Sequence, residues 1–127
     1  IIVYAFDQTA PEKRDKARAL LGEDAPWVVS WQVVQEFSSV ALHRFVKPLT
    51  VEFLDDFLEH VLWPHCRVHP SLSLYKSALQ IHRRTQYRFY DSLIVGAALE
   101  AGVRKLYTED LDEGRKLGEL RITNPFQ

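Results

Sequence analysis

The sequence predicts a single α/β domain with a mostly parallel sheet, and three observations lead to that prediction. Segments with helical spacing of apolar residues alternate with short apolar runs typical of strands. The run Trp27–Ser30 is apolar almost throughout, as expected for a parallel strand that is covered on both faces. The 127 residues suffice for one domain with a two- or three-layer core, and no linker or internal repeat divides them.

Six segments have the apolar spacing or end signals of helices. Ser30, Thr50 and Ser71 stand where three of them begin and are typical N-cap residues. Gly22 and Gly102 stand where two of them end. The predicted helices are Glu12–Leu21, Trp31–Phe45, Thr50 to Trp63, Ser71 to Arg84 with Leu74, Ala78, Leu79 and Ile81 inside, Asp91 to Gly102, and a short one at Arg115–Leu120.

Four short runs are predicted strands, and a fifth segment is ambiguous. Ile1–Phe6 fits either a buried strand or the first turns of a buried helix, because six residues are too few for periodicity to decide. The four predicted strands are Trp27–Ser30, Cys66–His69, Arg104–Tyr107 and Leu120–Thr123.

The composition is that of a soluble globular protein, with 46% hydrophobic and 26% charged residues. The formal net charge is −1, so no global basic field indicates a nucleic-acid partner, although a local basic rim is compatible with it. Cys66 is the only cysteine, which excludes an intrachain disulfide and fits a cytosolic protein. No signal peptide and no apolar run of about 18 residues are present, so no membrane association is expected.

The stretch from Phe89 to Asp110 carries the clearest functional signal. Asp91 stands at the start of a very apolar helix, and Asp110 follows the predicted strand Arg104–Tyr107. Both are positions at which open parallel sheets bind ligands. Two carboxylates at one rim suggest a site for a hard divalent cation. Glu36 lies beside the inward stripe of its helix, within two turns of the strand end at Ser30.

Each of these carboxylates also has a purely structural interpretation. Asp91 fits a helix N-cap, worth about 1 kcal/mol. Asp110 fits a turn residue, and Glu36 fits a solvated helix edge. Similarly, Arg44 with Lys47, and the run of Arg83, Arg84 and Arg88 with Tyr87 among them, fit either a basic rim for a nucleic-acid backbone or a solvated helix face.

Four sequence blocks in order resemble the PIN-domain ribonucleases, and among these most closely the VapC-type toxins of toxin–antitoxin pairs. The blocks are Val33–Phe37, Phe89–Val95, Leu106–Leu111 and Asn124–Phe126. The resemblance implies a three-layer α/β/α sandwich, a parallel sheet with helices on both faces, over residues 1–127. It also implies Mg²⁺- or Mn²⁺-dependent cleavage of RNA.

The resemblance assigns roles to residues and partners to the chain. Carried over by motif, Glu36, Asp91 and Asp110 are the expected metal ligands and catalytic carboxylates. The residues themselves, apart from the resemblance, add Thr108, whose hydroxyl would orient a ligand or water, and Glu109, which fits either a neighbour that orients the ligands or a surface turn charge. Arg44, Arg84 and Arg88 are the expected contacts of the RNA backbone. The family further implies a cytoplasmic homodimer inhibited by an antitoxin, whose C-terminal segment would occupy an apolar groove near Phe6, Leu20 and Leu21.

Two rival functions stay open at this point. One is a PIN nuclease of RNA processing outside any toxin–antitoxin pair. The other is a PIN-like module that binds RNA or protein without catalysis. His65 and His69 lack the companion cysteine pair of a typical zinc site, and no glycine-rich loop indicates a nucleoside triphosphate.

The chain departs from the family pattern at its start. The family begins with a strand ending in Asp, followed by an apolar run that Ile1–Ala5 matches, so this run should begin a helix. Asp7 cannot replace the missing Asp, because it lies about a turn and a half further along a helix. We therefore expect that a strand ending in Asp precedes Ile1 in the natural protein.

Overall fold

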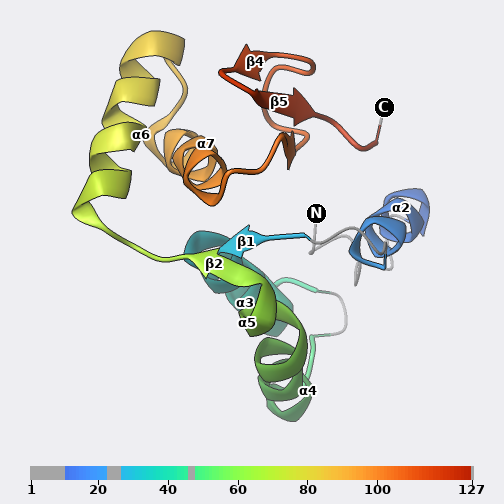
Figure 1. The fold of residues 1–127 in the computed structure, drawn as a ribbon. Helices are drawn as coiled ribbons and strands as arrows, with labels where there is room; N and C mark the ends of the chain where they lie inside the picture. The colour runs from blue at the N-terminus through green and yellow to red at the C-terminus, as the bar shows by residue number, and fades with distance from the viewer. Residues whose placement is uncertain (1–10, 23–26, 46–47, 127) are drawn as a thin grey trace.

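The computed structural model describes residues 11–22, 27–45 and 48–126 (Figure 1). The predictions for Ile1–Ala5, Phe6, Asp7 and Lys47 lie outside these residues. The helices are α2 (Pro11–Leu21), α3 (Trp31–His43), α4 (Val51–Phe57), α5 (Trp63–His65), α6 (Leu72–Thr85) and α7 (Phe89–Ala101), and the π-helix η1 (Leu58–Leu62) joins α4 to α5. The strands are β1 (Val29–Ser30), β2 (Cys66–Val68), β3 (Lys105–Tyr107), β4 (Lys116–Leu117) and β5 (Leu120–Thr123).

The five described strands form two small sheets. β1 pairs with β2 in parallel, and β3 pairs with β5 in parallel, while β4 adds to the other edge of β5 in the antiparallel sense. All four predicted strands are present, and the prediction of a mostly parallel sheet is confirmed. Among the described strands, no ladder joins the β1–β2 pair to the β3–β5–β4 sheet.

Helices cover both faces of the β1–β2 pair, which confirms the three-layer α/β/α arrangement. On one face, Val29 packs against a cluster that contains Phe37 and Ala41 of α3. On the other face, Val68 packs against Leu93 and Ala97 of α7, and α6 packs against α7 in turn (Figure 1).

Helix α7 lies between α6 and the β3–β5–β4 sheet, which explains why it is apolar nearly all round (Figure 1). Val95 and Ala98 belong to one core cluster with Ile122 of β5. Leu93 and Ala97 belong to another, with residues of α6. The most apolar helix of the described chain therefore packs in two interfaces at once. Asp91 lies in the first turn of this helix.

Most of the predicted helix ends are confirmed by local hydrogen bonds. The hydroxyl of Thr50 accepts from the Phe53 N–H at 3.1 Å, and that of Ser71 accepts from the Leu74 N–H at 3.1 Å. Gly102 ends α7 with a φ of 72°, a left-handed conformation that glycine adopts without steric cost. Ser30 occupies the N-cap position of α3, but its side chain makes no capping bond.

Three details of the helix predictions are wrong. Residues 115–120 form the β4–β5 hairpin instead of a helix, because Gly118 has a φ of 63° at the first position of a two-residue turn. Leu79 is 55% exposed instead of inside. The helix predicted to end at Trp63–Pro64 continues through α5, since proline is tolerated in the first turn of a helix.

In residues 11–22, 27–45 and 48–126, no helix has both the length and the apolar character needed to cross a bilayer.

Candidate metal and nucleic-acid site

One buried side chain connects Glu36 to the start of α7. Helix α3 begins directly after Ser30, the last residue of β1, so its first turns lie at the carboxyl end of a parallel strand. The Gln32 amide Nε2 donates to the Glu36 carboxylate at 3.2 Å and lies 3.5 Å from the backbone oxygen of Tyr90. Because Asp91 follows Tyr90, the two predicted carboxylates Glu36 and Asp91 belong to neighbouring helix turns.

Asp91 is not an N-cap. The N-cap of α7 is Arg88, and Asp91 is the third residue of the helix, where a carboxylate interacts favourably with the helix dipole. Its side chain is half-buried, and no hydrogen-bond donor to it is found among the described residues. The capping interpretation of this aspartate is therefore wrong.

Two buried oxygen atoms where β1 meets α3 have no hydrogen-bond partner in the described part of the chain. They are the Ser30 hydroxyl and the Gln32 amide oxygen, both at the junction of β1 and α3. A buried polar atom without a partner costs about 1–3 kcal/mol, which makes such atoms informative about a site. Carboxylate, hydroxyl and amide oxygens are the hard donors that Mg²⁺ and Mn²⁺ prefer, so the donor set fits such an ion.

The sequence patterns did not identify Ser30 or Gln32 as site residues. Ser30 fits the pattern of an ordinary helix cap, and Gln32 lies one residue before the apolar stripe of α3. The only signal in the sequence is a glutamine four residues before Glu36, a spacing that puts both side chains on one face of a helix.

Asp110 lies in the turn that follows β3, where its side chain is exposed. Its backbone N–H donates to the Thr108 hydroxyl at 3.2 Å, and the Thr108 N–H donates to the Thr123 carbonyl at 3.0 Å. Thr108 therefore shapes the turn that presents Asp110.

Glu109 is paired with a cation of a distant helix. Its carboxylate accepts from the Lys13 ammonium of α2 at 3.0 Å, and the same ammonium lies 5.5 Å from the centre of the Phe126 ring. This ion pair attaches α2 to the turn next to Asp110.

The described residues do not bring Glu36, Asp91 and Asp110 into one close group. Among them, the single set of three ligating side chains with donor atoms within 4.8 Å of one another is Asp56, Glu59 and His60. These three are exposed on α4 and η1, and the His60 Nδ1 also lies 3.1 Å from the Asp56 backbone oxygen. Exposed acidic groups of this kind are common on helices without any metal. Because this group contains none of the three predicted carboxylates, the assignment of Glu36, Asp91 and Asp110 stays a prediction.

The predicted RNA-contacting arginines are exposed at helix ends. Arg44 follows α3, Arg84 is in the last turn of α6, and Arg88 is the N-cap of α7, three residues before Asp91. Within the described residues, no carboxylate lies at ion-pair distance from any of the three. Tyr87, by contrast, is half-buried, and the Arg115 guanidinium carbon lies over its ring, 5.3 Å from the centre of the Tyr87 ring.

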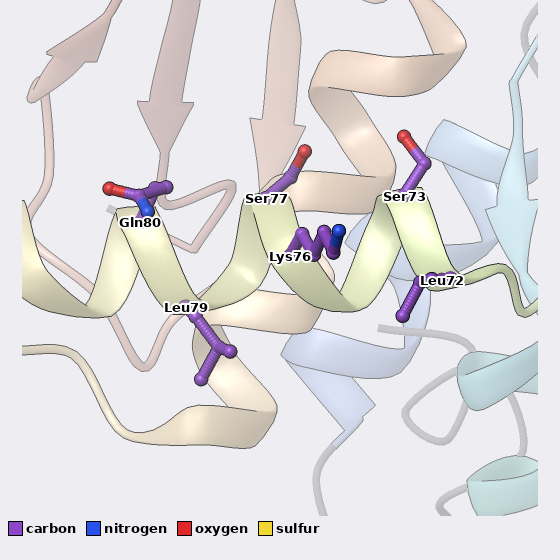
Figure 2. A pocket seen from close by; sticks show the side chains of 6 residues that line it. All are labelled: Leu72, Ser73, Lys76, Ser77, Leu79 and Gln80. Carbon is purple, nitrogen blue, oxygen red and sulfur yellow. The ribbon is translucent and has the colours of Figure 1, made fainter.

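A hollow of about 680 Å³ lies on the exposed side of α6, and Figure 2 labels the side chains that line it. It is lined by Leu72, Ser73, Lys76, Ser77, Leu79 and Gln80, with no carboxylate among them. This hollow lacks the ligands that a metal site needs, so it is separate from the candidate site at α3 and α7.

No curated protein matches the chain in a sequence search. The family model of the PIN domain matches residues 1–118, nearly the whole chain. PIN nucleases generally use divalent metal ions, in agreement with the oxygen donors at the β1–α3 junction. The chain belongs to the PIN domain family and has its nuclease-type fold.

Proposed function

We propose that the protein is a metal-dependent endoribonuclease and the toxin component of a toxin–antitoxin pair. The observation that best supports this proposal is the double contact of Gln32, which ties Glu36 of α3 to the first turn of α7 beside Asp91. Both carboxylates fall in the sequence blocks that resemble the PIN family, and two buried oxygens at the β1–α3 junction lack partners in the described structure.

In this proposal, Glu36, Asp91 and Asp110 would hold one Mg²⁺ or Mn²⁺ ion. The ion would polarise the phosphodiester bond and lower the pKa of an attacking water. Gln32 keeps the Glu36 carboxylate in one orientation, and Thr108 shapes the turn that carries Asp110. Arg88, next to the site, and Arg84 bind backbone phosphates of the RNA.

The decisive experiment is RNA cleavage by the full-length gene product. Pooled tRNA and rRNA are incubated with Mg²⁺, with Mn²⁺ or with EDTA, and the 5′ ends of the fragments are mapped. We expect discrete cuts that require metal and that Asp91→Asn reduces on the order of 100-fold or more. Glu100→Gln, an exposed carboxylate near the other end of α7, is the matched control and should cleave normally.

Two outcomes would contradict the proposed enzymatic function. Cleavage that persists unchanged in Asp91→Asn would point to a contaminating nuclease or a different site. Absence of cleavage together with absence of Mn²⁺ binding by calorimetry would favour the non-catalytic RNA- or protein-binding module.

The toxin role needs a test of its own, because an RNA-processing PIN nuclease would cleave RNA as well. We expect that induced expression in the cytoplasm arrests growth, that Asp91→Asn removes the arrest, and that a small neighbouring gene encodes an antitoxin that co-purifies with the protein. Sedimentation of the purified protein would test the expected homodimer. Normal growth of cells that express the protein, when the same protein cleaves RNA in vitro, would favour the RNA-processing nuclease.

A further inference from the structure

Three exposed aromatic side chains contact one another beside the candidate site. Tyr75 of α6 is 37% exposed, and Phe89 and Tyr90 of α7 are 40% and 69% exposed. The ring centres of Tyr75 and Phe89 are 6.4 Å apart with nearly parallel planes, at 5°, and those of Phe89 and Tyr90 are 5.8 Å apart at 67°. A group of exposed apolar side chains marks an interaction site more often than a lone exposed residue does.

This aromatic row, Tyr75–Phe89–Tyr90, rests on rigid elements. Trp31, the first residue of α3, meets the Tyr75 ring edge to face at 6.4 Å and packs against the core between α6 and α7. The backbone oxygen of Tyr90 lies 3.5 Å from the Gln32 amide. The rings are therefore presented by two helices, α6 and α7, with support from Trp31 of a third, instead of by a loop.

Cations without an ion-pair partner among the described residues lie next to the row along the chain, and Asp91 follows Tyr90 on its other side. Between residues 60 and 90 the chain contains no Asp or Glu, but it contains the cations Arg67, Lys76, Arg83, Arg84 and Arg88. All five are exposed, and no carboxylate of the described residues pairs with them. Two of them are chain neighbours of the rings, Lys76 next to Tyr75 and Arg88 next to Phe89.

Apolar rings among unpaired cations fit an occupant that has flat apolar faces and negative charge. A second copy of the chain would bring the same unpaired cations to a symmetric interface, and that repulsion disfavours it. Nucleic acid has both properties, since bases stack on aromatic side chains while phosphates bind Arg and Lys. The bases must be unpaired, because in a duplex their faces are already stacked on one another.

We propose that Tyr75, Phe89 and Tyr90 form a stacking platform for unpaired bases of the RNA that this protein binds. The inference rests on the proposed nuclease function for the identity of the ligand, and it adds a base-stacking subsite made of three rings on α6 and α7. Tyr90 directly precedes Asp91 in α7, so the platform would hold nucleotides next to the phosphate that is cut.

The test is binding without cleavage, measured by fluorescence anisotropy in EDTA. The probes are a labelled 12-nucleotide single-stranded RNA, the same strand with abasic positions, and a blunt RNA duplex. We expect the intact single strand to bind best, and Tyr90→Ala and Tyr75→Ala to weaken its binding by about tenfold each. Tyr90→Trp should bind like the natural protein, and Leu79→Ala, an exposed apolar residue on the same helix as Tyr75, should have no effect.

The salt dependence separates stacking from charge. Arg88→Gln should weaken all three probes and reduce the slope of log Kd against log salt by about one unit, whereas Tyr90→Ala should leave the slope unchanged. Equal binding by Tyr90→Ala, Tyr75→Ala and the natural protein would overturn the platform. So would ring variants that lose dimerisation while binding RNA normally, because the row would then be an interface between copies.

Failure of the platform and failure of the nuclease are distinguishable. If Asp91→Asn leaves cleavage unchanged but the ring variants lose the single strand, the platform stands and the proposed catalytic site does not. If Asp91→Asn abolishes cleavage but the ring variants bind normally, the nuclease stands and the platform does not.

Discussion

The Gln32 amide lies 3.2 Å from the Glu36 carboxylate on one side and 3.5 Å from the Tyr90 carbonyl oxygen on the other. Gln32 is 8% exposed, so water does not readily take its place. One side chain thus holds an acidic residue of α3 in register with the first turn of α7. This makes Gln32 a positioning residue for the proposed site.

Gln32→Leu should lower RNA cleavage by about 10- to 100-fold, the usual cost of removing the partner that orients a metal ligand. The fold should tolerate it, because leucine also removes the amide oxygen that lacks a partner in the described structure. Cleavage kinetics, Mn²⁺ binding and thermal unfolding would be measured together. Gln35→Leu, on the exposed side of α3, is the matched control, and equal cleavage by the two variants would contradict the positioning role.

Gly96 of α7 lies in close contact with α6. A Cβ atom at this position would lie 3.3 Å from Leu74 Cδ1 and 3.8 Å from the backbone nitrogen of Ala78. Gly96→Val should therefore lower the free energy of unfolding by about 1–3 kcal/mol through overpacking. In Gly96→Ala, the gain of about 1 kcal/mol in helix propensity should offset the single tight contact. Urea unfolding would measure both, and a valine variant as stable as the natural protein would show that the two helices can separate without cost.

Features that depend on local hydrogen bonds could be predicted from the sequence. Thr50, Ser71 and Gly102 mark helix ends correctly because each acts within one helical turn. The segment 115–120 could not, since its residues suit a helix but its backbone is held by pairing to β5. The hairpin pairing of β4 with β5 overrides a weak helical preference there.

For the candidate site, the sequence predicts residue types, and it does not predict how those residues come together. The order of Glu36, Asp91 and Asp110 is visible in the sequence. The contact of Gln32 with Tyr90 spans 58 residues, so it depends on how α3 and α7 pack and no local pattern reveals it. The distances between the three carboxylates likewise depend on how the two sheets are joined.

His65 should contribute to stability through Trp27. The two rings stack with centres 3.6 Å apart at 12°, and the His65 Nδ1 lies 2.7 Å from the Trp27 carbonyl oxygen, which makes it the donor. The Trp27 Nε1 in turn donates to the Leu21 carbonyl at 3.0 Å, so this pair links α5, the start of β1 and the end of α2. His65→Ala should lower the free energy of unfolding by about 1–3 kcal/mol.

Differential scanning calorimetry would compare this variant with His43→Ala, an exposed histidine in the last turn of α3. A melting temperature lowered only in His65→Ala is expected. An equal effect of both substitutions would show that the stack with Trp27 adds nothing to stability.

The last prediction concerns alkaline pH. Burial raises the pKa of the Cys66 thiol above its ordinary 9.0, against the smaller, opposite effect of a hydrogen bond with the Val68 backbone. Burial also raises the pKa of the Tyr87 phenol above its ordinary 10.0, although the nearby Arg115 acts in the opposite direction. The folded protein therefore holds both protons more tightly than the unfolded chain. The contribution of these two groups to the free energy of unfolding is complete below pH 9. It is lost as the pH rises through the pKa values of the two groups in the folded protein.

Urea unfolding between pH 8 and pH 10.5 would measure this loss, with the difference in slope between variant and natural protein as the readout. Cys66→Ala and Tyr87→Phe should each make the decline of stability with pH less steep, because each removes one of the two titrating groups. The Cys66 thiol should also react slowly with iodoacetamide at pH 8 in the folded protein and quickly in urea, as a buried thiol does. If both variants declined as steeply as the natural protein, the alkaline loss would have to arise from other groups.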